Sequence, residues 1–307
     1  YVRFANIYSA YQDSKGQIWL GSKPDGLFRL REQANGAFKI EHFENNPADS
    51  YSLSGSSVFC ISEDNRGRIW LATHGGGINC IDNPGAEKPR FVNSNNLLAR
   101  YKESYNKKTF SVAFTRKGVM LAGSNKGLMV ADANVDDLSQ MTIRLHQREP
   151  DRRNSLSNSY VRNIIEDSLN RVFVCTESGG VNQIVSDSLL ATKLDFLHYC
   201  SHTDFPTDIA QSVIEHDGKL WVVGRNMLVR LNPDSSTINH SNAFLETEQL
   251  VFSEAVPKKL PDGRWLFGLQ FGGAIALNLD SMMVNENNHR IAITSVRIHD
   301  KLFFGNS

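Results

Sequence analysis

The chain has 307 residues with 33 basic and 33 acidic side chains, so its formal net charge is zero. This balance excludes the basic stripe of a nucleic-acid-binding protein, and no apolar run approaches the roughly 20 residues that cross a bilayer. The length exceeds what one hydrophobic core usually supports, which predicts several domains or one domain with many small cores. Because the first residue is Tyr1 rather than Met, we expect the chain to be part of a longer protein.

One sequence pattern repeats six times along the chain. Each copy contains alternating hydrophobic residues, a short polar turn, an aromatic–aliphatic pair and a cluster of small residues, as in RGRIWLATHGGGINCI at residues 66–81. One aromatic or leucine position, the anchor, aligns in all six copies at spacings of 51, 51, 52, 48 and 45 residues. The anchors are Trp19, Trp70, Leu121, Phe173, Trp221 and Leu266. The repeat predicts six similar units within one domain.

The second copy shows which strands to expect in one unit. Val58–Glu63, Arg68–Thr73 and Ile78–Asp82 are short β-rich runs separated by the turns DNRG and HGGG, which is typical of hairpin strands. A weaker fourth strand is expected in FKIEHF, MTIRLHQ and LDFLHYC of the first, third and fourth copies. Four antiparallel strands in about 50 residues are typical of a β-propeller blade. We predict an all-β fold, a β-propeller of four-stranded antiparallel blades in a six- or seven-bladed ring.

Two structural roles follow from this fold. The anchor lies on the second strand of each blade and is expected to fill the space between neighbouring sheets. Leu53 and Leu156, two periods apart, are expected to cover the start of the innermost strand. The cysteines Cys60, Cys80, Cys175 and Cys200 lie on strands about 9.5 Å apart within their blades, beyond disulfide reach, and are expected to be free, mostly buried thiols.

The two ends of the chain suggest a domain boundary. We predict that Tyr1–Phe4 complete the last blade by pairing with its third strand, and a further blade encoded upstream is the alternative. The tail IAITSVRIHDKLFF alternates like a strand but belongs to no copy of the repeat. We therefore expect the propeller in residues 1–290 and the start of a following domain in residues 291–307.

The segments ISEDNRGRIWLATHGGGINCID (residues 61–82) and AYQDSKGQIWLGSKPDGLFRL (residues 10–30) resemble the two-component regulator propeller repeat. The resemblance implies the periplasmic sensor region of an inner-membrane hybrid two-component system of the Bacteroidetes type. It implies that the ligand is an oligosaccharide released from a polysaccharide, and that the histidine kinase and transcription regulation belong to the parent protein. It also implies that the tail opens an immunoglobulin-like domain, that other domains of the sensor are partners, and that the parent forms a homodimer.

The turns between strands two and three differ most among the six copies, and such variation on a fixed scaffold creates binding specificity. Sugar recognition needs an aromatic platform and planar polar side chains that pair with hydroxyl groups. The candidate ligand-binding residues in these turns are Lys23, Asp25, His74, Asn125, Glu177, Arg225, Asn226, Gln270 and Phe271. Additional stacking residues on longer loops are Tyr51, Tyr105 and Phe205.

Three functions remain open at this point. The first is the ligand-sensing propeller, and the second is a purely structural propeller for protein interaction or dimerisation. The third is a lyase or glycosidase, for which His74 and Glu177 occupy equivalent turns and could converge. The polar turns offer one carboxylate each, too few for calcium, and there is no zinc pattern or nucleophile motif. We therefore expect no catalytic residues, no metal, no cofactor and no enzymatic activity in the propeller itself.

Overall fold

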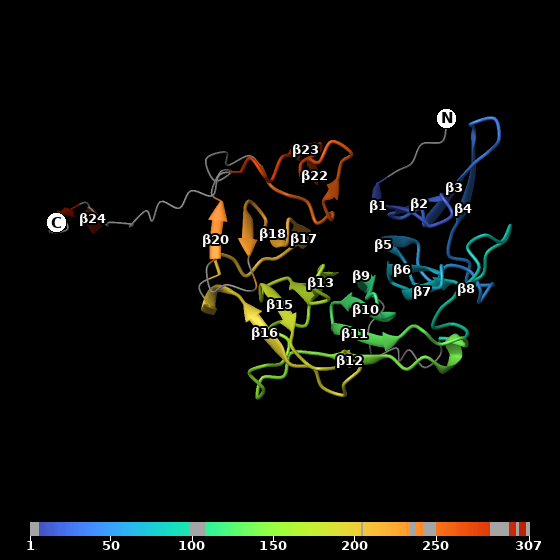
Figure 1. Cartoon of the computed structure of the whole chain (residues 1–307), viewed down its shortest axis with the longest axis horizontal. Coiled ribbons are helices and arrows are strands. Elements are labelled where there is room, and N and C mark those ends of the chain that lie inside the picture. The colour runs from blue at the N-terminus through green and yellow to red at the C-terminus, as the bar shows by residue number, and fades with distance from the viewer. Residues whose placement is uncertain are drawn as a thin grey trace.

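The computed structural model describes residues 6–98, 108–203, 205–231, 233, 238–241, 250–282, 295–298 and 301–304. Within these ranges six antiparallel sheets, the blades of a propeller, follow one another around a common axis (Figure 1). Strands neighbour one another in chain order within a blade, and the first strand lies nearest the axis. The prediction of an all-β propeller with four-stranded blades is confirmed, and the described residues form six blades, five of four strands and the sixth of three.

The first three blades match the predicted strand runs closely. The first blade contains β1 (Ile7–Gln12), β2 (Ile18–Ser22), β3 (Leu27–Glu32) and β4 (Phe38–Phe43). The second contains β5 (Ser57–Glu63), β6 (Ile69–His74), β7 (Gly77–Ile81) and β8 (Phe91–Val92). The third contains β9 (Thr109–Phe114), β10 (Val119–Ser124), β11 (Gly127–Asp132) and β12 (Arg144–His146), with the short 3₁₀ helix η2 (Leu138–Gln140) between its last two strands.

The next two blades continue the same order. The fourth contains β13 (Val161–Glu166), β14 (Val172–Thr176), β15 (Val181–Ile184) and β16 (Phe196–Tyr199), followed by the 3₁₀ helix η3 (Ser201–Thr203). The fifth contains β17 (Ser212–His216), β18 (Lys219–Val223), β19 (Leu228–Leu231) and β20 (Ile238–Ser241). None of the helices described is long and apolar enough to span a membrane.

The sixth blade and the C-terminal segment differ from the rest. The sixth sheet contains β21 (Lys258–Lys259), β22 (Trp265–Gly268) and β23 (Ala274–Leu277) in the described part of the chain. Tyr1–Phe4, predicted to complete this blade, lie outside the described residues. β24 (Ser295–Ile298) and β25 (Lys301–Phe304) pair as a separate antiparallel hairpin. The boundary near residue 290 and the immunoglobulin-like domain stay predictions.

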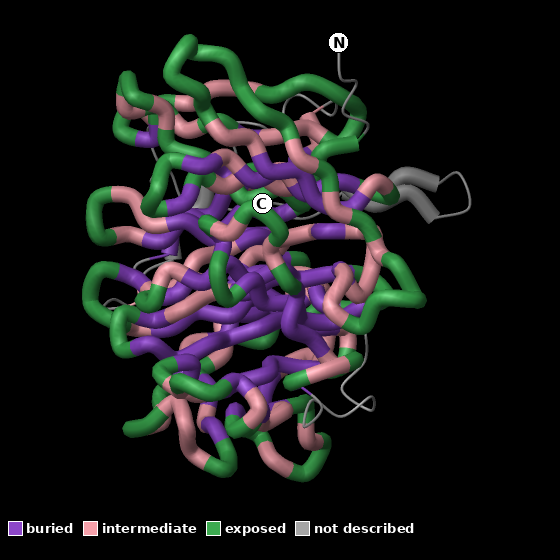
Figure 2. Tube along the Cα trace, turned by 90° about the vertical axis from the view of Figure 1, so that its right-hand side faces the viewer, coloured by how far each residue is buried: buried purple, intermediate pink, exposed green. Residues whose placement is uncertain are grey.

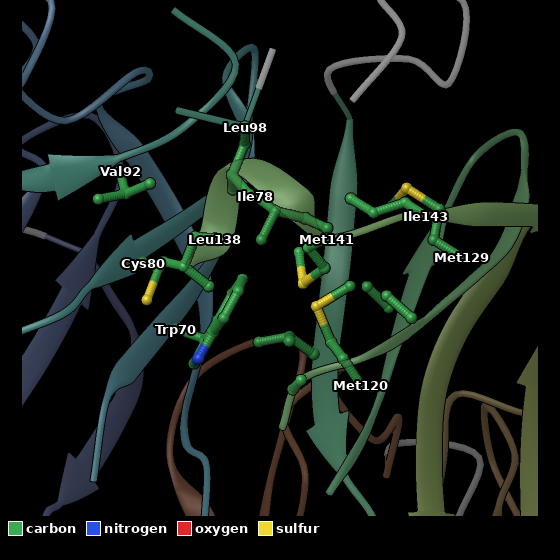
Figure 3. Packing of buried hydrophobic residues seen from close by; sticks show 14 of the residues in the cluster. Trp70, Ile78, Cys80, Val92, Leu98, Met120, Met129, Leu138, Met141 and Ile143 are labelled. Atoms are coloured by element: carbon green, nitrogen blue, oxygen red, sulfur yellow. The ribbon is translucent and has the colours of Figure 1, made fainter. Parts of the chain in front are cut away.

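The hydrophobic core is divided into layers between neighbouring blades, as Figure 2 shows by the buried residues inside the sheets and the exposed turns at the rims. Trp70 is fully buried and packs in one cluster with Met120 and Met129 of the third blade (Figure 3). Burying a Trp side chain removes about 200 Å² from water, a gain of about 5 kcal/mol before entropy costs. Leu53 and Leu156 are also fully buried, as predicted, in the layers after the first and third blades.

The anchor prediction is confirmed in five blades and is wrong in the sixth. The first five anchors are at most 2% exposed, and each packs against the blade that follows it. Leu266 is 39% exposed. Its strand neighbour is Lys258, whereas the corresponding neighbour of Trp221 is the buried Ile214. Charged strand neighbours also occur beside buried anchors, as Arg29 does beside Trp19, so the neighbour is not the reason. Among the described residues, no hydrophobic cluster joins the sixth blade to the first, and Leu266 therefore lacks the layer that covers the other anchors.

Aspartates in the turn after the first strand hold the anchors in place. Oδ2 of Asp64 accepts two hydrogen bonds, from the Trp70 indole N–H (2.7 Å) and from Arg68 Nε (2.7 Å). Asp13 accepts from the indole of Trp19 in the same way (2.8 Å). These carboxylates point into the blade and are satisfied there, which supports the hairpin interpretation over a calcium site.

Glutamates at the end of the first strand connect neighbouring blades. Glu63 accepts a hydrogen bond from the backbone N–H of Ser14 in the preceding blade (2.8 Å). Glu215 does the same with Ser168 (2.8 Å). Glu166 accepts from the backbone N–H of Arg116 (2.8 Å). A charge-assisted bond of this kind fixes the angle between two blades near the axis.

The four cysteines are free thiols, as the strand spacing predicts. Three of them, Cys80, Cys175 and Cys200, are buried, and Cys60 is partly buried. Cys60, Cys80 and Cys175 pack as small apolar residues in the layers between blades.

Candidate functional site

A β-bulge interrupts the innermost strand of each of the first four blades. In β1, Ile7 pairs with Ser22 and Ser9 pairs with Gly21, so one residue between them is extra. The same shift occurs in β5, β9 and β13. The extra residues are Tyr8, Phe59, Phe110 and Arg162. A bulge turns its extra side chain away from the regular alternation, and bulges are frequent next to functional sites.

The bulge side chains form a continuous set of contacts around the end of the axis. The ring centroids of Tyr8 and Phe59 lie 5.1 Å apart, and those of Phe59 and Phe110 lie 6.1 Å apart, both edge to face. Phe110 stacks on Tyr160 at 4.9 Å. The Arg162 guanidinium lies 5.1 Å from the Phe110 centroid and 4.7 Å from that of Tyr160. We call these five residues the aromatic cluster.

Four of the candidate residues lie in turns that are tied to the innermost strands by backbone hydrogen bonds. In the first, third and fourth blades the backbone N–H of the candidate donates to the carbonyl of the residue just before the innermost strand, and in the sixth blade it donates to the residue before the bridge between Phe252 and Leu269. The pairs are Lys23 with Asn6, Asn125 with Lys108, Glu177 with Tyr160 and Gln270 with Val251. These turns and the start of the innermost strands therefore share one face of the propeller, which we call the axial mouth.

His74 lies on the same face, beside the aromatic cluster. Its ring centroid is 6.0 Å from that of Phe59, and its backbone forms a β-bridge with Lys108 of the next blade. The ammonium group of Lys23 lies 6.0 Å from the Tyr8 ring centroid. Burial lowers the pKa of His74, and the positive charges of Lys108 and Lys23 lower it further. The first three blades therefore give the mouth a positive side.

Glu177 is held by an ion pair on the other side of the mouth. Arg162 Nε pairs with its carboxylate, and the two terminal nitrogens of Arg162 reach the Glu254 carboxylate, each at 3.1 Å. The contacts that connect Glu177 with His74 run through Arg162, Phe110 and Phe59. This arrangement does not join the two residues as an acid–base pair.

The remaining candidates have separate surroundings. The backbone carbonyl of Asp25 accepts a hydrogen bond from His42. Arg225 and Asn226 are exposed on the turn of the fifth blade, and Phe271 is 80% exposed on that of the sixth. These side chains are available to a ligand but lie outside the aromatic cluster.

Two of the three stacking residues proposed on longer loops are not available at the site. Phe205 is 2% exposed in the core layer between the fourth and fifth blades, so it cannot stack on a ligand. The Tyr51 ring is covered by Arg90, whose guanidinium lies 3.6 Å from the ring centroid. Tyr105 lies outside the described residues.

The sequence contains a signal for the cluster that the turn-based argument missed. Tyr8, Phe59, Phe110 and Arg162 each stand eleven residues before the anchor of their copy. The corresponding positions in the fifth and sixth copies are Ala210 and Ala255. The position thus holds a large side chain in four copies and a small one in two.

The matching repeats fall on the first two blades. Residues 2–23 and 52–75 match the sequence model of the two component regulator propeller. These two segments are thus similar to two-component regulator propeller repeats. The resemblance inferred from the EDNRG turn and the Trp70 strand is thereby confirmed. No curated protein matches the chain.

Several solved structures share the fold of these propeller repeats. The extracellular domain of the hybrid two component system BT3049 from B. thetaiotaomicron is 18% identical, with a TM-score of 0.59 over 96% of this chain and 42% of that one. That of BT4673, a one component system from the same organism, is 13% identical, with a TM-score of 0.56 over 97% and 45%. Virginiamycin B lyase from Staphylococcus aureus, solved with quinupristin, is 15% identical, with a TM-score of 0.58 over 87% and 78%. The chain spans less than half the length of the first two.

The described part of the chain does not meet the requirements of a metal site. Among the residues that the structure describes, no group of three or more His, Cys, Asp or Glu side chains could hold a metal ion. The polar groups at the axial mouth are instead arranged as ion pairs and exposed donors around aromatic rings.

Proposed function

We propose that the chain is the ligand-sensing propeller of an extracytoplasmic, periplasmic sensor region in a hybrid two-component regulator. We further propose that it responds to oligosaccharides from polysaccharide breakdown. The match to two-component regulator propeller repeats supports this, as do two similar folds, the extracellular domains of a hybrid two component system and of a one component system. Histidine kinase activity belongs to the parent protein in this proposal, and the parent is a homodimer.

The observation that carries this proposal is the aromatic cluster at the axial mouth. Sugar rings present a flat apolar face that packs on aromatic side chains, while their hydroxyl groups pair with polar groups beside them. Tyr8 is 45% exposed, and Phe59, Phe110 and Tyr160 are half-buried, so their rings are held in place yet reachable. Arg162 and Glu254 add donors and acceptors at the edge of this platform.

The test compares two aromatic residues of nearly equal exposure. Tyr8→Ala removes a ring of the aromatic cluster, and Phe38→Ala removes a ring on the outer strand β4 that is 46% exposed. Calorimetric titration with a panel of neutral and acidic oligosaccharides identifies the ligand first. We expect Tyr8→Ala to weaken its binding at least about tenfold, which corresponds to about 1.4 kcal/mol, and Phe38→Ala to leave it unchanged. Equal affinities of both variants would overturn the assignment of the site.

An enzymatic role has weaker support in this chain. The similar lyase shows that the fold can carry catalysis, but Glu177 is ion-paired and is connected to His74 only through the aromatic cluster in the contacts described. A structural role in dimerisation is the other alternative. It would be favoured if no oligosaccharide of the panel binds.

A further inference from the structure

The charges around the axial mouth are unevenly distributed. Its two carboxylates described above, those of Glu177 and Glu254, both pair with Arg162. Lys23 and Lys108 are exposed, and within the residues that the structure describes neither ammonium group has an anionic partner. Both carboxylates therefore have a cationic partner, although they share one guanidinium, whereas the two ammonium groups have no anionic partner among these described residues.

The basic groups lie together and beside the most exposed part of the aromatic cluster. Lys108 is bridged to His74 through the backbone, and His74 contacts Phe59. Lys23 lies over Tyr8, which in turn contacts Phe59. The positive charges of Lys108 and Lys23 both lower the pKa of His74, which agrees with these contacts. Lys23 and His74 thus lie beside two aromatic rings, and Lys108 is the backbone partner of His74.

We propose that the ligand of the axial mouth is an acidic oligosaccharide, whose anionic group binds between Lys23, His74 and Lys108 while its sugar ring packs on Tyr8 and Phe59. This inference rests on the proposed function and specifies the substrate class of that site. A carboxylate of a uronic acid and a sulfate ester share the chemistry that this basic group recognises, since both are compact oxyanions. Neutral sugars would leave two ammonium groups at the edge of the bound ring without a partner.

The experiment uses acidic and neutral probes of similar length. Tetragalacturonate and a heparin-derived tetrasaccharide represent the carboxylate and the sulfate source, and tetragalacturonate methyl ester, xylotetraose and mannotetraose represent neutral sugars. We expect an acidic probe to bind at least about tenfold more tightly than every neutral one, with an affinity that falls as salt rises. Comparison of the first two probes distinguishes the two sources of the anion.

A pair of double variants with equal change in net charge provides the control. Lys23→Gln/Lys108→Gln removes the two lysines of the proposed anion site and should weaken the acidic probe at least about tenfold and reduce its salt dependence. Lys39→Gln/Lys193→Gln removes two lysines on the outer surface, where they pair with Glu41 and Glu149, and should leave both quantities unchanged. Equal effects of the two double variants would contradict the proposal.

The failure of this inference differs from the failure of the proposed function. Binding of a neutral probe as tight as that of the acidic ones overturns the acidic specificity and leaves an oligosaccharide sensor. Absence of binding to every probe overturns the proposed function and the inference with it. Far-UV circular dichroism of the variants confirms that the propeller is folded in each case.

Discussion

Asp64→Ala tests how the blades are held together, because Asp64 and Arg68 form a buried ion pair in the turn of the second blade. Their side chains are 2% and 3% exposed, and Nε of Arg68 lies 2.7 Å from the carboxylate. The other nitrogens of Arg68 donate to the backbone carbonyls of Ala133 and Val135 in the third blade. Loss of Asp64 therefore leaves a buried charge with only these two neutral acceptors.

Two contributions determine how much unfolding free energy Asp64→Ala loses. Removing one partner of a buried ion pair costs about 3–5 kcal/mol, and the remaining carbonyl contacts of Arg68 favour the lower end of that range. The Trp70 indole N–H also loses its acceptor, which costs about 1 kcal/mol more. We expect the free energy of unfolding to fall by about 4 kcal/mol. With a urea m-value of about 3 kcal/mol per molar, the midpoint shifts by about 1.3 M.

The matched control is Asp262→Ala, since Asp262 pairs with Arg264 in the corresponding turn of the sixth blade. That pair is about half exposed, so its loss should leave the urea midpoint unchanged. The double variant Asp64→Ala/Arg68→Met should recover at least about 2 kcal/mol, because it removes the unpaired charge. Urea unfolding is followed by fluorescence and circular dichroism together. A midpoint of Asp64→Ala equal to that of Asp262→Ala would refute the reasoning.

Three further predictions concern the core layers. Phe173→Ala should lower the free energy of unfolding by about 3–5 kcal/mol and Leu266→Ala by about 1 kcal/mol or less. The reason is that Phe173 is fully buried whereas Leu266 is 39% exposed. Equal losses in urea unfolding would contradict this. Burial and the nearby Arg144 lower the pKa of His146 to about 4. Between pH 6.5 and 4 the unfolded chain therefore binds a proton that the folded chain does not, and the free energy of unfolding falls by up to about 3 kcal/mol as the pH drops. In His146→Leu this part of the pH profile should be absent. Burial raises the pKa of Cys175 far above its usual range, so in a timed assay its thiol should react with Ellman's reagent only after unfolding.

The repeat in the sequence is enough to predict the fold, since its turns and anchors mark strands that the structure contains. The anchor Trp70 and the run Val58–Glu63 were placed correctly because a period-two pattern and a buried aromatic depend on local sequence. The role of Leu266 was not predictable in this way. Its exposure depends on what packs against the outer face of the sixth blade, which the repeat does not specify.

The candidate site was predicted only in part, because it was sought in the variable turns. Those turns do surround the axial mouth, and Lys23, His74 and Glu177 lie there. The ion pair of Glu177 with Arg162 joins a turn to a strand fifteen residues earlier, and no local pattern indicates that contact. Phe205 shows the opposite error, since its loop position suggested exposure while the packing of two blades buries it.

A break in the hydrophobic alternation explains why the aromatic cluster exists and how it can be found. Val58 and Ile61 are both buried against the first blade, as Val161 and Ile164 are buried between the third and fourth. Two residues on one face of a strand should be separated by two or four positions, and a separation of three requires one extra residue. The extra residue is the bulge residue, Phe59 in β5 and Arg162 in β13. Its side chain does not have to pack in the layers between blades. In β17 the pairing is continuous and the position eleven residues before the anchor is the buried Ala210, so no side chain is directed to the mouth there. The number of innermost strands with a β-bulge therefore determines how many blades contribute a strand side chain to the axial mouth, independently of the turns that surround it.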